Sequence, residues 1–167
     1  TNWGISAPAL ASYMGKTPTV SDMKSLTRAT AQQILKNVFW LKNHFDRLKN
    51  QSVATLIYDG VVNHGTNGMR LLMENALRRI GVDVEYHKMF TLQGIELLNR
   101  LNQKKLFDSV KAVRTAKYKS LSQKEFLKGW LARLDRIQYI GDNNFMDIWP
   151  FTLLFIAGIG MFVIALV

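Results

Sequence analysis

The chain has 167 residues and no cysteine, and its 22 basic and 12 acidic side chains give a formal net charge of +10. Without cysteine it can hold neither a disulfide framework nor a thiolate metal site, and its histidines at 44, 64 and 87 are too scattered to pair on one helix face. A phosphate loop, a dinucleotide fingerprint and a nucleophile elbow are also missing from the sequence, so we expect no metal site and no cofactor.

The first part of the chain is predicted to form short helices and then a longer one. Residues 1–20 are rich in small residues, glycine and proline, and favour a loop with at most a short helix at 9–14. Ser21 begins a short helical turn, and Thr27 is placed to cap a helix that runs to about Trp40.

Two helices with a glycine-containing break between them are predicted in the middle of the chain. The first starts at about Ser52 and ends at the Asn-His-Gly sequence 63–65, and the second occupies 67–80 and is closed by Gly81. The stretch 82–90 alternates weakly, which is consistent with an extended connector or a short strand.

Three capped helices are predicted to follow. Thr91 caps a brief helix, and Asn102 caps a longer one whose outward face carries Lys104, Lys111, Arg114 and Lys117. The sequence Ser-Gln-Lys-Glu at 122–125 makes a capping box for the last helix. Sustained strand alternation does not occur, so we predict a mainly α domain of about seven helices.

The last twenty residues, 148–167, contain no charged and no amide side chain. A helix of this length, at about 1.5 Å per residue, reaches about the thickness of a hydrocarbon core. We therefore predict a single C-terminal transmembrane helix, a lipid bilayer as one partner, and a linker at 141–147. The alternative is a buried core helix, but such helices seldom run apolar on every face for so long.

The basic excess predicts attraction to anionic polymers, which include nucleic acid, anionic lipid and acidic wall material. The basic face of the helix after Asn102 lacks interleaved exposed aromatic residues and a nucleic-acid reading motif. We interpret that face as a solvated surface, and we do not expect nucleic acid as a partner.

Two positions are candidates for a binding or catalytic site. Asp59 lies in the apolar end of a predicted helix, where a carboxylate needs a partner, and Asn63 follows one turn later on the same face. We interpret Asp59 as a structural acid satisfied by a cap or a basic side chain, with a catalytic acid as the alternative. Trp3 stands in a polar loop where cleft exposure and burial are both consistent with the pattern, unlike the expected core residues Phe39, Trp40 and Trp130.

Several short motifs occur in an order that resembles one enzyme family. The sequence T-N-W-G-I-S at 1–6 resembles the T-N-x-G-I-T segment of the lysozyme-like N-acetylmuramidases of glycoside hydrolase family 108, which include phage endolysins and secretion activator proteins. Residues 26–29 with Phe39 and Trp40 resemble the family's L-T-R-x-x-A…Y-W helix, and Asp59 with 63–65 resembles its D-x-x-x-N-x-G turn.

The second half of the chain carries the same resemblance. Residues 75–82 resemble the L-Q-x-x-L-G-V region, and the F-x-x-G-W-x-x-R helix of the attached peptidoglycan domain is matched by Phe126, Gly129, Trp130 and Arg133. The resemblance implies a lysozyme-like muramidase region at 1–66 and a helical peptidoglycan-binding region at 67–140 packed on it.

The resemblance also implies roles for single residues. Asn2, Trp3 and Gly4 would bind substrate as the lining of a cleft, and Asp59 with Asn63 would support that substrate-binding site. Thr1 would be the catalytic residue that helps to hold the attacking water. The family's catalytic glutamate belongs to an E-G-G motif upstream of a D-P-G-G-x-T stretch whose threonine matches Thr1, so that glutamate is not in this chain.

Two functions are therefore expected. The first is a membrane-anchored muramidase that cleaves the glycan strand of peptidoglycan, if a glutamate precedes Thr1 in a longer protein. The alternative is a non-catalytic, membrane-anchored peptidoglycan-binding or structural protein of a virion or cell envelope, with other virion or envelope proteins as further partners. Either would be a single-pass membrane protein whose soluble domain faces the periplasm or cell wall, in a bacterial inner membrane or a phage virion membrane.

Overall fold

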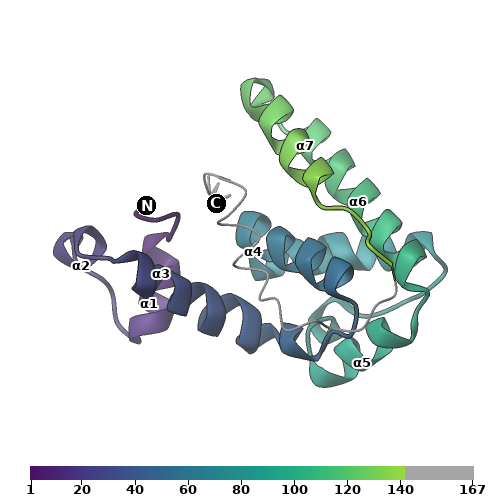
Figure 1. Cartoon of the computed structure of the whole chain (residues 1–167), viewed down its shortest axis with the longest axis horizontal. Coiled ribbons are helices and arrows are strands. Elements are labelled where there is room, and N and C mark those ends of the chain that lie inside the picture. Colours follow the sequence, from purple (N-terminus) through teal and green to yellow (C-terminus); the bar gives the residue numbers. More distant parts are fainter. Residues whose placement is uncertain (142–167) are drawn as a thin grey trace.

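The computed structural model describes residues 1–141, and these residues are mainly helical, as predicted. The α-helices of this part, labelled in Figure 1, are α1 (Ala7–Met14), α2 (Val20–Lys24), α3 (Arg28–Ile34), α4 (Gln51–Arg79), α5 (Leu92–Arg100), α6 (Gln103–Ser120) and α7 (Leu127–Arg136). A π-helix, Leu35–Trp40, continues α3. Short 3-10 turns occur at Leu41–Asn43, Phe45–Arg47, Tyr86–Lys88 and Lys124–Phe126.

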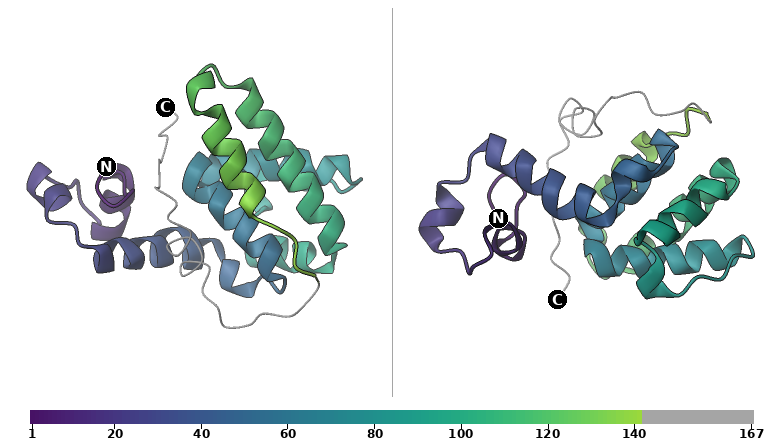
Figure 2. Two further views of the ribbon diagram at one scale, coloured as in Figure 1. Left: turned by 45° about the horizontal axis from the view of Figure 1, so that its top comes forward. Right: turned by 90° about the horizontal axis from the view of Figure 1, so that it is seen from below.

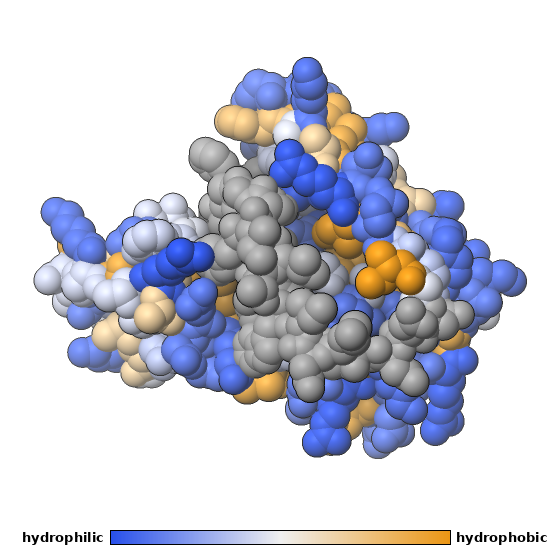
Figure 3. Space-filling view, in the orientation of Figure 1, coloured by the Kyte–Doolittle hydropathy of each residue, from blue (hydrophilic) through white to orange (hydrophobic). Residues whose placement is uncertain are grey.

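The helices form two parts, an arm (α1–α3) and a bundle (α4–α7), as Figures 1 and 2 show. The π-helix that continues α3 packs against both α1 and α4, so it joins the arm to the bundle. Within the bundle α6 packs along α4, and α7 packs on α6. Hydrophilic residues cover much of the visible surface of both parts (Figure 3).

An aromatic cluster holds the junction between the two parts. Trp40, which ends the π-helix, is buried and meets Phe45 and Tyr58 edge to face, with ring centroids 6.0 and 5.4 Å apart. Phe45 in turn meets Phe90 at 5.0 Å. Edge-to-face pairs at such distances add to the free energy of burying the rings. The expectation that Trp40 lies in the core is therefore confirmed.

Side-chain caps set most of the helix starts. Thr27, Thr91 and Asn102 each accept a hydrogen bond from the backbone N–H three residues later, at 3.1, 3.2 and 2.9 Å. All three caps were predicted. One start differs by a residue, because Thr19 and Asp22 form a capping box, so α2 begins before Ser21.

The capping box predicted at 122–125 is wrong. The backbone N–H of Lys124 donates to the carbonyl of Ser122 at 2.8 Å, and Gln123 between them has φ −75° and ψ 72°. This is an inverse γ-turn, whose geometry takes Ser122 out of the position of a helix cap. A 3-10 turn follows, and α7 begins at Leu127.

The break predicted at 63–65 is a kink and not the end of a helix. Gly65 has φ 71° and ψ 163°, a backbone region that essentially only glycine adopts, and α4 resumes directly after it. The predicted boundary between 66 and 67 therefore falls inside α4. In the following stretch, 82–90, the described residues form a connector with one 3-10 turn and no strand.

Replacing Gly65 by alanine is expected to lower the free energy of unfolding by about 1–3 kcal/mol. A Cβ at Gly65 would meet open space among the described residues, so backbone strain alone accounts for the effect. Gly129 in α7 is the matched control, because it also has open space around it and lies within a helix. Gly129→Ala is expected to stabilise the fold by about 0.5–1 kcal/mol. Equal responses of the two variants in urea unfolding would contradict the assigned strain.

Within residues 1–141, no helix combines the length and the apolar character that crossing a bilayer requires. The predicted transmembrane helix at 148–167, and all of the predicted linker 141–147 except Gly141, lie outside the described residues.

Candidate functional site

The first residues form a tight turn that presents one aromatic side chain. The backbone N–H of Ile5 donates to the carbonyl of Asn2 at 2.8 Å, and the N–H of Asn2 donates to the carbonyl of Ile5 at 3.2 Å. Trp3 and Gly4 lie between them with φ of 50° and 74°. Positive φ at both central residues is the geometry of a type I′ turn, which suits glycine and strains a bulky residue such as Trp3.

Asn2 fixes this turn to the rest of the arm. Its side-chain amide donates to the carbonyl of Met23 at 2.9 Å, where α2 is about to end. The Asn2 side chain, which was predicted to bind substrate, thus binds the protein's own backbone, and in doing so it positions Trp3. Ile5, the last residue of the turn, is buried and anchors the turn in the hydrophobic core.

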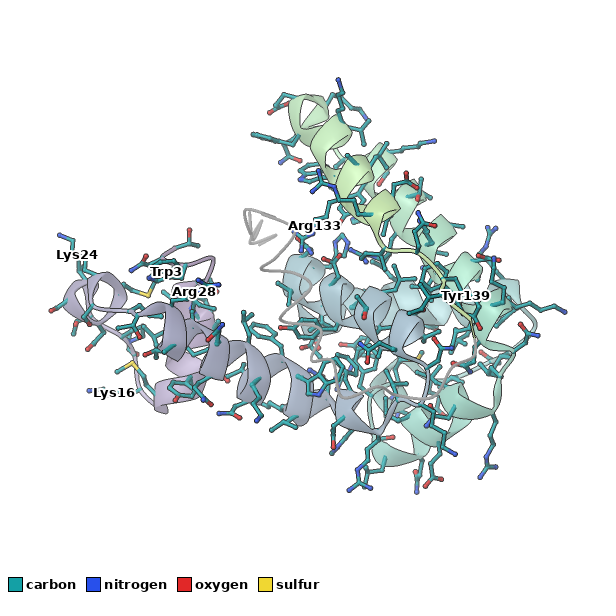
Figure 4. The ribbon with its side chains drawn as sticks, viewed as in Figure 1. Trp3, Lys16, Lys24, Arg28, Arg133 and Tyr139 are labelled. Carbon is teal, nitrogen blue, oxygen red and sulfur yellow. The ribbon has the colours of Figure 1, made fainter. Side chains whose placement is uncertain are left out.

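Trp3 is the exposed member of the turn. The residue is 51% exposed, although tryptophan is usually well buried. Figure 4 places it on the arm together with Lys24 and Arg28, whereas Arg133 lies on the bundle. A strained backbone that holds a large aromatic group in solvent is a common sign of a binding role.

Asp59 lies at the centre of a buried charge cluster. The carboxylate and the guanidinium of Arg114 are both fully buried, and their Oδ2 and Nη2 atoms are 2.6 Å apart. Arg133, from α7, donates from Nε and Nη2 to the other carboxylate oxygen, Oδ1, at 2.8 and 2.6 Å. Residues on α4, α6 and α7 thus meet at one carboxyl group.

The remaining hydrogen-bonding groups of this cluster tie the three helices together. Arg114 also donates to the backbone carbonyl of Leu56 at 2.9 Å and to the Tyr118 hydroxyl at 3.1 Å. Arg133 donates from Nη1 to the side-chain oxygen of Asn63 at 2.7 Å. The amide nitrogen of Asn63 donates to the backbone carbonyl of Asp59 at 2.6 Å.

Electrostatics keep this cluster charged. Burial by itself raises the pKa of Asp59, but the charges and hydrogen bonds of Arg114 and Arg133 outweigh burial and hold that pKa below its ordinary value. Burial likewise acts to lower the pKa of Arg114, and the Asp59 carboxylate with the Tyr118 hydroxyl more than compensates. Asp59 therefore stays ionised, which is the reverse of what a general acid requires.

Asp59 is thus a structural acid satisfied by basic side chains, and its side chain is not available to touch a substrate. It acts through Arg114 and Arg133, which its carboxylate binds, and through Asn63, which donates to its backbone carbonyl. The structure brings Asp59 and Asn63 together, as predicted, but Figure 4 shows that the turn around Trp3 lies on a different part of the molecule from Arg133.

The prediction that Arg114 points outward is wrong, because its side chain is fully buried. Leu106, Val110, Arg114 and Tyr118 are spaced by four residues, and all four are buried. The periodicity of α6 therefore places residue 114 on the inner stripe. The four-residue spacing was visible in the sequence, but arginine is rarely buried, so residue 114 was predicted to face solvent. Arg133 was noted as part of the F-x-x-G-W-x-x-R motif, but no nearby residue in the sequence indicated that it binds Asp59.

Among the described residues, the acidic side chains with clearly displaced pKa values are not shifted in the direction that a general acid needs. Three carboxyl groups there have clearly displaced pKa values, and all three are lowered: Asp22 by its hydrogen bonds to Thr19, Asp59 by the two arginines, and Glu85 by Lys88. A proton donor at neutral pH needs a raised pKa. Within residues 1–141, no three histidine or acidic side chains gather to hold a metal ion.

The strained turn and the α4 helix up to its kink lie within one segment that matches a known protein family. Residues 1–65 match the glycosyl hydrolase 108 family. The match to glycosyl hydrolase 108 therefore includes the turn with Trp3, the π-helix, Asp59 and Asn63.

A solved structure supports the fold beyond this segment. The structure of Brucella abortus SagA is similar to this chain with a TM-score of 0.68 and 22% sequence identity, over 82% of this chain and 76% of that chain. At this identity the likeness concerns the fold. Among curated proteins, no sequence matches the chain.

Proposed function

We propose that this chain is part of a lysozyme-like peptidoglycan hydrolase, which cleaves the glycan strand between N-acetylmuramic acid and N-acetylglucosamine. The observation that carries the proposal is the match of residues 1–65 to glycosyl hydrolase 108. The net charge of +10 and the exposed Trp3 are consistent with an anionic, sugar-containing polymer as the substrate.

In this proposal the described residues bind and orient the glycan. Trp3 stacks on a sugar ring from its strained turn, and Asn2 holds that turn in place. The exposed Thr1 helps to hold the attacking water, and the carboxylic acid that protonates the leaving oxygen is supplied by a glutamate before Thr1. The hydrophobic segment 148–167 anchors the domain in a bacterial inner membrane or a phage virion membrane, facing the periplasm or the cell wall.

The direct test is an assay for new reducing ends in purified sacculi. The assay uses the full-length protein from its natural source, whose intact mass also establishes whether residues precede Thr1. Release of reducing ends that terminate in N-acetylmuramic acid is the expected result. If the protein binds the sacculi but no new reducing ends appear, hydrolysis is excluded.

Replacing Trp3 by glycine is expected to weaken binding of an N-acetylglucosamine oligomer about tenfold, because the stacking surface is lost. The same change is expected to raise the free energy of unfolding by at most about 1 kcal/mol, since glycine adopts a positive φ without strain. Tyr13→Ala is the control, because Tyr13 is an exposed aromatic residue of α1 outside the turn. Calorimetric titration and urea unfolding measure the two effects. Unchanged affinity in the glycine variant would remove Trp3 from the binding site.

A non-catalytic peptidoglycan-binding protein is the second candidate. The lowered pKa of Asp59 and its engagement by two arginines favour it, because the most deeply buried acid of the described part is structural. This alternative keeps the same glycan contacts and the same membrane anchor, with other virion or envelope proteins as partners. It predicts retention on sacculi at moderate salt without turnover.

A further inference from the structure

A pocket of about 610 Å³ opens at the kink of α4. Residues on both sides of Gly65 line it, and Lys117 of α6 closes one wall. Its polar lining comes from His64, Thr66, Asn67, Asn75 and Lys117, and Leu71 and Leu72 contribute an apolar surface. The pocket exists because the Gly65 backbone conformation turns the second half of α4 away from the line of the first. The charge cluster lies behind it and does not form its wall.

The pocket carries positive charge without a counter-charge. Lys117 is half-buried, and among the described residues it has no ion pair, and no acidic side chain lines the pocket. Behind the wall, Arg114 and Arg133 share the single carboxylate of Asp59, so that cluster has one excess positive charge. A partly dehydrated ammonium group next to excess positive charge favours an anionic ligand.

His64 adds a neutral wall to this positive site. Its ring packs on that of Tyr118 with centroids 5.0 Å apart. Burial first, and then the charge of Arg114, lower the pKa of His64 to about 3, so the imidazole is uncharged at neutral pH. In the part of the chain that the structure describes, its buried Nε2 atom has no hydrogen-bond partner. A ligand beside this atom therefore displaces no hydrogen bond of Nε2.

The other lining groups indicate what the anion is attached to. Asn67 and Asn75 are exposed and present side-chain amides, which can donate to and accept from peptide groups. The oxygen of Asn75 accepts a long hydrogen bond, 3.5 Å, from Nη1 of Arg78, and its NH2 group can donate to a ligand. Leu71 is 53% exposed beside them and offers contact to a small apolar side chain. This lining suits a short peptide with a free carboxylate, because it offers one ammonium group, two amides and one leucine. A neutral sugar suits it less well, because it has no charge for Lys117 to bind.

We propose that the pocket at the α4 kink binds the free carboxylate of a short peptide, with Lys117 as the charged contact and Asn67 and Asn75 as partners of the peptide groups. The stem peptide of peptidoglycan is the source of such a carboxylate, and this identification rests on the proposed function. The peptide site is separate from the turn around Trp3, so the chain would hold peptide and glycan at two places.

The test uses the full chain and three soluble probes in calorimetric titrations. The first is N-acetylmuramoyl-L-alanyl-D-isoglutamine, which has a free carboxylate, and the second is the same compound with that carboxylate converted to an amide. The third, glycerol phosphate, represents a wall polymer anion without a peptide. Only the first is expected to bind, and Lys117→Gln is expected to weaken it about tenfold while Lys117→Arg stays within a few-fold. Lys119→Gln, on the exposed surface of α6, is the matched control.

Equal binding of the acid and the amide, or full affinity in Lys117→Gln, would overturn the proposal. Preferential binding of glycerol phosphate would overturn the peptide as ligand. A titration with an N-acetylglucosamine oligomer distinguishes failure of the pocket proposal from failure of the proposed function. Binding of the oligomer without the peptide removes only the pocket proposal, whereas peptide binding without retention on sacculi removes the proposed function and leaves the pocket.

Discussion

Replacing Asp59 by asparagine is expected to lower the free energy of unfolding by about 3–5 kcal/mol. The change keeps the shape of the side chain but leaves the fully buried Arg114 and the nearly buried Arg133 without a counter-ion. A buried guanidinium cannot escape by losing its proton, because its pKa is too high. The midpoint of urea unfolding, followed by helical circular dichroism, measures the loss.

Two further variants make this prediction specific. Arg133→Met keeps the Asp59–Arg114 pair and removes the excess charge, so it is expected to cost clearly less than Asp59→Asn. Asp135→Asn removes an acid whose side chain is 81% exposed and 3.5 Å from Lys111. It is expected to leave the midpoint almost unchanged, because exposed ion pairs contribute little. An Asp59→Asn variant as stable as Asp135→Asn would show that the cluster contributes no stability.

The stability of the protein is expected to fall in acid in two stages, the first of which comes from His64. The pKa of this residue is about 3 in the folded state and 6.5 ordinarily. Between these values the unfolded chain binds a proton that the folded chain does not, so stability decreases as the pH falls from 6.5 toward 3. The slope for one such group is at most about 1.4 kcal/mol per pH unit. His64→Phe, which keeps a ring against Tyr118, is expected to flatten this stage.

Asp59 accounts for the second stage. Because its folded pKa lies below the ordinary 3.8, its stabilising charge is fully present above that pH and is lost as the pH falls further. Asp59→Asn should therefore remove most of the loss below pH 4, because Asp22 and Glu85, whose pKa values are also lowered, make only surface contacts. It should retain the loss above pH 4, the opposite of His64→Phe. Urea unfolding at a series of pH values separates the two stages. An imidazole resonance of His64 that titrates near 6.5 would contradict the first.

Local patterns explain why much of the secondary structure was predictable. The caps at Thr27, Thr91 and Asn102 act within three residues, so a sequence contains both partners of each hydrogen bond. The break at 63–65 was also visible, because glycine tolerates a backbone conformation that other residues avoid. The capping box at 122–125 failed although its residues are the expected ones, since a backbone hydrogen bond across Gln123 competes for the same segment.

The site was less predictable because its decisive contacts are distant in the chain. By itself the sequence determined the helical class and the excess of positive charge, and it left the exposure of Trp3 as one of two alternatives. It also carried the resemblance to glycoside hydrolase family 108, which the family match over residues 1–65 supports. Only the tertiary structure decided that Asp59 is satisfied by Arg114 and Arg133, which are 55 and 74 residues away. Caps and helical periodicity act between near neighbours, whereas a buried charge takes its partner from whichever helix packs against it.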